Sequence, residues 1–276
     1  MSESQPARHR ARKRFGQNFL QDGQIIARIV SAIAPSPTDL MVEIGPGQAA
    51  LTGPLLQRLQ RLKVIEIDRD LVARLRQRPP PGGELEIIEA DALSLNFAEL
   101  APTGGLRVVG NLPYNISTPI LFHLLQSLRH IEDMHFMLQR EVVERMAAAS
   151  GSKVYGRLSV VLQARCSVQP LFMVPPTAFV PAPKVESAIV RLRPLPEQPE
   201  AAVLRQLEFI TRTAFGRRRK TLNNALDGAV DLDQLRALDI DPKLRAEALS
   251  VSQWLSLAES TAATADADTA ASNLSA

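Results

Sequence analysis

The segment Gly110-Asn111-Leu112-Pro113-Tyr114 carries the residue types needed to activate an aromatic amine. An exocyclic aromatic amine is a poor nucleophile because its lone pair is delocalised into the ring. The side-chain oxygen of Asn111 and the backbone carbonyl of Leu112 can each accept one of its N–H groups. The nitrogen is then drawn toward sp³ geometry and its lone pair is aimed at an electrophile, so that transfer depends mainly on positioning. The competing interpretation is a chance turn rich in asparagine and proline.

Aromatic side chains that could hold the target base flank this chemistry. Pro113 stiffens the turn, and Tyr114 offers a ring face on which a base can stack. Phe179 lies in a proline-rich loop at residues 175–181, and we expect it to form the second wall of a sandwich around an unstacked adenine. The alternative is that Phe179 is a core residue.

A glycine turn and two acidic residues predict a nucleoside site. Residues 42–48 (Val-Glu-Ile-Gly-Pro-Gly-Gln) follow an expected strand and precede an expected helix, so Gly45 can let the backbone approach a ligand closely. Glu66 ends the next expected strand and can accept both hydroxyls of a ribose, and Asp91 follows the third and can accept from an adenine amino group. The dinucleotide fingerprint G-x-G-x-x-G is not met because its last position is Ala50. These residues alone leave open whether the nucleoside belongs to a dinucleotide or to S-adenosylmethionine.

Short apolar runs alternate with helical patterns before residue 195. This alternation predicts right-handed βαβ units and a parallel sheet of α/β class. Asp22 is expected to cap the first helix, and residues 187–192 alternate as an edge hairpin strand does. The expected sheet segments are 40–44, 62–67, 85–88, 107–109, 134–139, 160–163 and 187–192, and the expected later helices are 51–62, 70–76 and 120–128.

The composition changes after Arg193, where prolines form a linker and helical patterns follow. Residues 250–253 (Ser-Val-Ser-Gln) form a capping box for a last helix that carries Trp254. From Ser260 the chain is aperiodic and rich in Ala, Thr, Asp and Ser. We therefore expect a catalytic domain at 1–195, a helical domain at 196–259 and a disordered tail at 260–276. One face of the helical domain's first helix is expected to carry Val203, Leu207, Ile210 and Ala214.

The basic residues are concentrated although the formal net charge is only +3. Clusters with few nearby acids favour a polyanionic partner, because Lys and Arg displace counterions from its backbone. A merely solvated face is the alternative. The residues expected to bind RNA are Arg12, Lys13, Arg14, Arg217, Arg218, Arg219 and Lys220.

Other protein classes are disfavoured by composition. No apolar run reaches the roughly 18 residues needed to span a membrane, and residues 1–14 lack the apolar stretch of a secretory signal. An organellar transit peptide is an alternative interpretation of these basic residues. Cys166 is the only cysteine and the four histidines lack ligand spacing, so we expect a cytoplasmic protein without a metal.

Several segments together resemble the ribosomal RNA adenine N6,N6-dimethyltransferase family, and most closely its bacterial small-subunit branch, which is linked to kasugamycin sensitivity. The resemblance covers roughly residues 12–257. The segment Gly110–Tyr114 also resembles the N/D-P-P-Y motif of amino-methyltransferases, with Leu112 in its second position. The matching segments are 13–20, 43–47, 110–117, 136–139, 183–188 and 218–222.

The resemblance implies a Rossmann-like, seven-stranded class I methyltransferase sheet followed by a small all-α C-terminal domain. It implies S-adenosylmethionine as cofactor and dimethylation of two adjacent adenines near the 3′ end of 16S rRNA in the immature 30S subunit, by an enzyme expected to be monomeric. The superfamily often has a third glycine where this chain has Ala49, and we expect the turn to survive the added methyl group. The implied cofactor contacts are Asn18, Leu20, Gly45, Glu66, Asp91 and Asn111.

Three rival functions remain at this stage. A 23S rRNA adenine methyltransferase of the macrolide-resistance type would share the sheet, the motif and the cofactor, but Pro46 and the basic region at 215–226 resemble the small-subunit branch more. A ribosome-assembly or transcription factor without catalysis is opposed by intact Asn111, Tyr114, Glu66 and Asp91. A DNA adenine methyltransferase is disfavoured because no sequence-reading domain is apparent.

Overall fold

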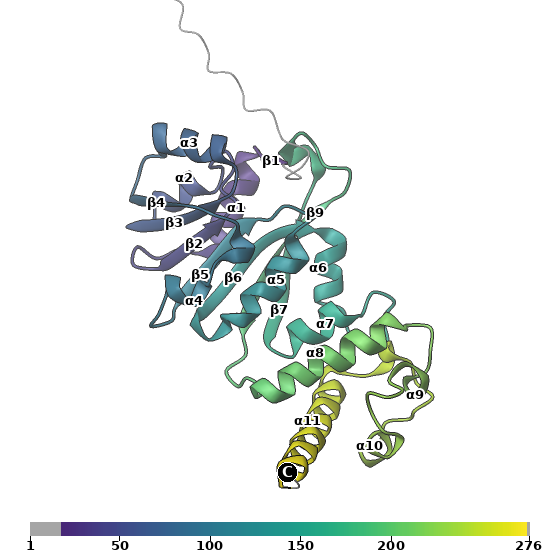
Figure 1. The fold of residues 1–276 in the computed structure, drawn as a ribbon. Helices are drawn as coiled ribbons and strands as arrows, with labels where there is room; N and C mark the ends of the chain where they lie inside the picture. Colours follow the sequence, from purple (N-terminus) through teal and green to yellow (C-terminus); the bar gives the residue numbers. More distant parts are fainter. Residues whose placement is uncertain (1–17, 275–276) are drawn as a thin grey trace, which may run out of the picture. The chain divides into compact units, whose positions relative to one another are not determined.

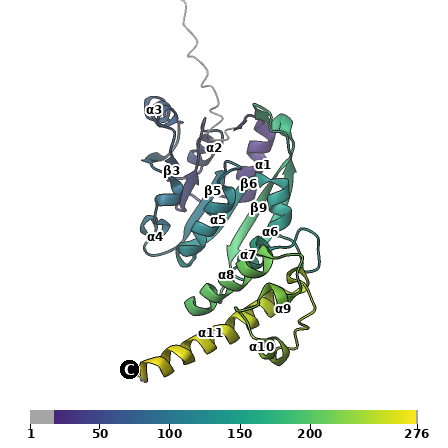
Figure 2. The ribbon, with the colours of Figure 1, turned by 45° about the vertical axis from the view of Figure 1, so that its right-hand side comes forward.

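The computed structural model describes the backbone of residues 18–274 and the side chains of residues 18–264 (Figures 1 and 2). Two compact units are present. The first comprises Met1–Val142 and Pro170–Leu192, and the second Val143–Gln169 and Arg193–Ala276. The sequence places residues 143–169 in the first domain, whereas side chains such as Tyr155 and Val160 pack in the core of the second unit.

A seven-stranded, mostly parallel sheet forms the first unit's framework, as predicted (Figure 1). β2 lies between β3 and β5, and its carboxyl end therefore lies in the middle of the sheet. β9 pairs antiparallel with β6 and is bordered by β7, so the expectation that residues 187–192 form an edge strand is wrong. In spatial order the strands are β4 (Glu84–Glu89), β3 (Arg61–Glu66), β2 (Leu40–Ile44), β5 (Leu106–Asn111), β6 (Ile131–Gln139), β9 (Ser187–Pro194) and β7 (Cys166–Val174).

Helices connect these strands. Asp22 caps α1 as predicted, since its Oδ1 accepts from the backbone N–H of Gln24 at 2.9 Å and of Ile25 at 3.1 Å. The helix expected at 51–62 ends at Leu56, because the chain must turn before β3 begins at Arg61. The helices are α1 (Gly23–Ile33), α2 (Thr52–Leu56), α3 (Arg69–Gln77), α4 (Phe97–Leu100) and α5 (Ser117–Gln126), and a 3-10 helix, η2 (Ala92–Ser94), follows β4.

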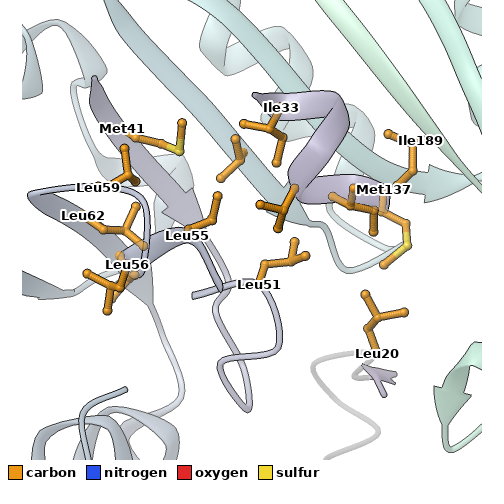
Figure 3. Close-up of a cluster of buried hydrophobic side chains, with 14 of the residues drawn as sticks. Leu20, Ile33, Met41, Leu51, Leu55, Leu56, Leu59, Leu62, Met137 and Ile189 are labelled. Carbon is orange, nitrogen blue, oxygen red and sulfur yellow. The ribbon is translucent and has the colours of Figure 1, made fainter. Parts of the chain in front are cut away.

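A hydrophobic cluster fixes the strands that carry the site (Figure 3). Ile33 of α1, Leu55 of α2 and Met41 of β2 point toward one another and are almost fully buried. Met137 and Ile189 continue the cluster on β6 and β9. Removal of this apolar surface from water is the main term that holds α1 and α2 against the sheet.

A buried arginine joins the opposite ends of the same elements. Arg107 on β5 donates from Nε to Asp133 of β6 at 3.0 Å and also forms an ion pair with Asp39. Its Nη2 donates to the carbonyl of Ile33 at 2.6 Å, at the end of α1. One guanidinium thus pairs two carboxylates and satisfies a helix carbonyl that has no intrahelical partner.

The second unit is helical. Residues 160–163, expected in a strand, lie in α7 because their buried side chains pack against the C-terminal helices. The predicted capping box is confirmed: Ser250 Oγ accepts from the N–H of Gln253 at 3.2 Å, and Gln253 Oε1 accepts from the N–H of Ser250 at 3.0 Å. Helix α6 (Arg140–Met146) follows β6 and contains the boundary between the two units after Val142. The helices of the second unit are α7 (Arg157–Gln163), α8 (Ala201–Gly216), α9 (Leu222–Ala225), α10 (Leu232–Ala237) and α11 (Val251–Leu274).

Helix α11 does not stop at residue 259. Thr261 and Ala262 are buried, and Thr261 Oγ1 donates to the carbonyl of Leu257 at 3.0 Å. The prediction of a disordered tail from Ser260 is therefore wrong for residues 260–264, which pack as helix, and the helix extends to Leu274. The small residues of this segment give no sequence pattern, but its last described turn contacts α10, where Gln234 Nε2 donates to Thr264 Oγ1 at 3.1 Å.

Candidate active site

The predicted site residues converge because parallel strands place their carboxyl ends at one edge of the sheet. Ile44 pairs with Ile65, and Glu66 pairs with Glu89 on the next strand. Every predicted catalytic or cofactor-binding residue except Phe179 lines one cavity at this edge. These residues are Asn18, Leu20, Gly45, Glu66, Asp91, Asn111, Leu112, Pro113 and Tyr114.

The glycine turn is tight. Gly45 and Gly47 have φ of +70° and +56°, a region that L side chains rarely adopt. A Cβ on Gly47 would stand 3.3 Å from the Phe19 ring. Ala49 also has a positive φ, +65°. The turn therefore keeps a left-handed backbone at this position, although alanine stands where the superfamily often has glycine.

The acidic residues lie at successive strand ends. Glu66 is nearly buried and accepts from the N–H of Asp68 at 2.9 Å and of Gly47 at 3.2 Å, which couples the carboxylate to the glycine turn. Burial raises the pKa of Glu66, and the two backbone donors oppose this shift. Asp91 Oδ1 caps η2 through the N–H of Leu93 at 2.9 Å, so capping accounts for one of its two oxygens.

Glu43 is a site residue that sequence reasoning missed. The residue is 2% exposed, and its carboxyl group accepts from Thr52 Oγ1 at 2.7 Å within the wall of the same cavity. Burial raises the pKa of Glu43 to about 7, the Thr52 hydrogen bond lowers it, and nearby Glu66 raises it. The signal in the sequence was an acid inside an otherwise apolar strand, Met41-Val42-Glu43-Ile44.

The Asn111 amide is oriented by a backbone carbonyl. Asn111 Nδ2 donates to the carbonyl oxygen of Asn18 at 3.2 Å. Because a carbonyl can only accept, this contact assigns Nδ2 to Asn18 and leaves Oδ1 as the acceptor that the amide can offer to a substrate. The N–H of Leu112 donates to the carbonyl of Met137 at 3.2 Å, which anchors the turn to β6.

Tyr114 is held by a serine that sequence reasoning did not single out. The Tyr114 hydroxyl lies 2.6 Å from Oγ of Ser187, which is fully buried on β9. Partial burial raises the pKa of Tyr114, and the Ser187 hydrogen bond opposes the shift. The sequence places Ser187 in an expected strand and in a segment that resembles the family, but the contact across 73 positions is visible only in the fold.

Phe179 is packed in the core rather than at the cavity. Its side chain is 2% exposed within the hydrophobic cluster of Figure 3, and its strand β8 (Phe179–Val180) pairs with β1 (Phe19–Leu20). Phe179 is therefore a core residue in this structure, and its role in stacking against a base stays a prediction.

The structure separates the predicted RNA-binding residues into groups. Arg12, Lys13 and Arg14 lie outside the described residues. In the second unit, Arg218 donates to the carbonyl of Lys153 at 2.7 Å and forms an ion pair with Glu247 at 3.7 Å. Arg217, Arg219 and Lys220 are exposed after the end of α8, and Arg217 donates to the carbonyl of Asn224 over 3.4 Å.

Comparisons with known proteins identify the family. The model of the ribosomal RNA adenine dimethylase family matches residues 8–263. The chain belongs to this family. The ribosomal RNA small subunit methyltransferase A of Idiomarina loihiensis is 55% identical over 252 residues, which cover 91% of this chain and 88% of the relative. The protein of the same name from Legionella pneumophila strain Lens is 56% identical over 253 residues, covering 91% and 98%.

Solved structures support the same assignment. A dimethyladenosine transferase from Plasmodium falciparum has a TM-score of 0.73 at 27% identity, covering 87% of this dimethylase and 95% of that chain. The 23S rRNA methyltransferase ErmE has a TM-score of 0.65, also at 27% identity, covering 88% and 98%. The dimethylase is thus an S-adenosylmethionine-dependent methyltransferase whose substrate is ribosomal RNA.

The cavity suits this cofactor. A Cβ at Gly47 would crowd the Phe19 ring at 3.3 Å, so glycine keeps the turn compact at the cavity wall. Glu66 and Asp91 are acceptors of the type that ribose hydroxyls and an adenine amine require. Among the described residues, no group of three or more His, Cys, Asp and Glu side chains is arranged to hold a metal ion. No helix in the described part of the dimethylase is long and apolar enough to cross a membrane.

Proposed function

We propose that this dimethylase transfers two methyl groups to N6 of each of two adjacent adenines near the 3′ end of 16S rRNA, in the immature 30S subunit. Relatives at 53–56% identity carry the name of a small-subunit methyltransferase, and this favours the small-subunit RNA over the 23S RNA on which ErmE acts. The observation that carries the catalytic part is the Asn111 amide, whose Nδ2 is held by Asn18 beside the glycine turn.

The residues of the turn would prepare the adenine amine. S-adenosylmethionine supplies an electrophilic methyl group when it is bound. Asn111 Oδ1 and the Leu112 carbonyl would accept the two N–H groups of the amine, while Tyr114, fixed by Ser187, would hold the base plane. The methylated nitrogen is an acidic ammonium and loses its proton to water, so no strong general base is needed.

Cofactor contacts by Glu66 and Asp91 belong to the same proposal. Each would use acceptor capacity beyond its structural hydrogen bonds, Glu66 toward ribose hydroxyls and Asp91 toward the adenine amine. For Phe179 to form a second wall, its ring would have to leave the core cluster. We further propose a monomer that acts in the cytoplasm without a metal.

Mass mapping of rRNA tests the proposal. Cells that lack the protein should carry two unmethylated adenines near the 3′ end of 16S rRNA, and wild-type protein should restore four methyl groups. Asn111→Ala should restore none, because the amine loses its acceptor, yet it should still bind immature small subunits. Full dimethylation by the variant would refute the role of Asn111, and loss of methylation in 23S rRNA instead would refute the substrate.

A further inference from the structure

Helix α8 (Ala201–Gly216) has two contrasting faces in the second unit. Leu207, Ile210 and Ala214 are fully buried against the unit's core. Arg205, Phe209 and Arg212 are all exposed, and at about 100° per residue they lie within roughly 60° of one another on the opposite side. We call Arg205, Phe209 and Arg212 the outer face of α8.

Phe209 is unusual for a surface residue. Its side chain is 42% exposed, and it is the one aromatic among the strongly exposed large hydrophobic side chains of residues 18–264. Packing does not explain the choice of phenylalanine, because the core side of α8 is already filled by Leu207 and Ile210. Exposed aromatic rings beside basic residues are typical of surfaces that bind single-stranded nucleic acid.

The two arginines keep their charge available. Glu208 lies three residues after Arg205 and four before Arg212, a spacing at which helical ion pairs form. Even so, neither arginine has an ion-pair partner among the described residues, in contrast to Arg218, which Glu247 and Lys153 engage. Along the helix, Arg205 and Arg212 are about 10 Å apart with the ring between them.

The outer face continues toward the basic cluster that the sequence already singles out. Helix α8 ends at Gly216, immediately before Arg217–Lys220. The surface therefore offers cations and an aromatic ring in one continuous stretch of chain, which is complementary to a polyanion with unstacked bases rather than to an apolar protein surface.

We propose that the outer face of α8 binds an unpaired nucleotide of the ribosomal RNA, with its base stacked on Phe209 and the flanking phosphates held by Arg205 and Arg212. This inference rests on the proposed function for the identity of the RNA. It assigns to α8 a contact that adds affinity for the particle and takes no part in the chemistry.

Salt dependence separates stacking from charge. The full-length protein would be titrated with immature small subunits at several KCl concentrations. Phe209→Ala should weaken binding by about 5- to 100-fold and leave the salt slope unchanged, because a stacked ring releases no counterions. Arg205→Ala and Arg212→Ala should each reduce the slope of log K against log [salt] by about 1. Leu232→Ala on α10 is the matched control, since Leu232 is a similarly exposed apolar residue of the same unit, and should bind like wild type.

The variant Phe209→Trp gives a direct readout of stacking. It should retain wild-type affinity, and its added indole fluorescence should be quenched on binding, while buried Trp254 contributes a constant background. Affinity of Phe209→Ala equal to that of Leu232→Ala, or fluorescence of Phe209→Trp that stays unchanged at saturation, would overturn the inference. Methylation of the same particles by wild type tests the proposed function separately, because either result at Phe209 can occur with methylation intact.

Discussion

Glu43 makes the stability of this protein depend on pH in a predictable way. Its folded pKa of about 7 lies above the ordinary 4.5, so the folded state binds the proton more tightly than the unfolded state does. The stabilisation is therefore fully present below pH 4.5 and is lost as the pH rises toward and through 7. The difference between the two pKa values corresponds to about 3 kcal/mol, and most of this falls between pH 5 and pH 8.

The variant Glu43→Gln removes this dependence because glutamine cannot ionise and can still accept from Thr52. Urea unfolding of both proteins at pH 5 and pH 8 should show that the free energy of unfolding of wild type falls by about 2–3 kcal/mol more than that of the variant over this interval. Glu132→Gln, which changes an exposed glutamate of β6, should follow wild type. If the free energies of unfolding of wild type and Glu43→Gln differ by the same amount at pH 5 and pH 8, Glu43 is not a buried carboxyl group that is protonated at pH 5.

Three further predictions concern positioning and stability. Ser187→Ala and Tyr114→Phe each remove the 2.6 Å contact between the two hydroxyl groups, so each should lower kcat/KM for rRNA methylation by about 2- to 10-fold. The double variant should be no less active than either single variant, because both changes remove the same contact. If the losses of the two single variants add up in the double variant, the contact does not matter for activity. Ala49→Gly should raise the free energy of unfolding by about 0.5–1 kcal/mol by calorimetry, because it relieves a left-handed alanine, and a lower value would contradict the strain. Arg107→Met should lower the free energy of unfolding by about 3–5 kcal/mol in urea, because it leaves Asp133 buried without its arginine. Adding Asp133→Leu should recover part of this loss, and no recovery would mean that the buried charge is not its cause.

The sheet and its acidic strand ends were predictable because their signals are local. The apolar run at 40–44 and the glycines after it predicted β2 and its turn, and β2 spans Leu40–Ile44 as expected. Glu66 was expected at the end of a strand, and Glu66 and Asn111 are each the last residue of their strands. Parallel pairing then brings these ends together without further information.

The errors arose where distant partners decided the outcome. Residues 160–163 are apolar enough for either a strand or a helix, and packing against the C-terminal helices made them part of α7. Residues 260–264 have no pattern of their own, yet contacts with α10 hold them in α11. Phe179 packs in the core cluster, on a strand that pairs with β1, and its stacking role stays a prediction.

Sequence alone was sufficient for the fold class and for the first five strands of the main sheet, and it predicted the chemistry of the Asn111 turn, because each depends on residues close together in the chain. The partners of those residues were set only by tertiary structure. Asn18 orients Asn111 across 93 positions, Ser187 holds Tyr114 across 73, and Thr52 and the neighbouring carboxylate of Glu66 tune the buried Glu43. Hydrogen-bond geometry and burial are properties of the packed chain, so they appear only when the strand ends and loops meet in space.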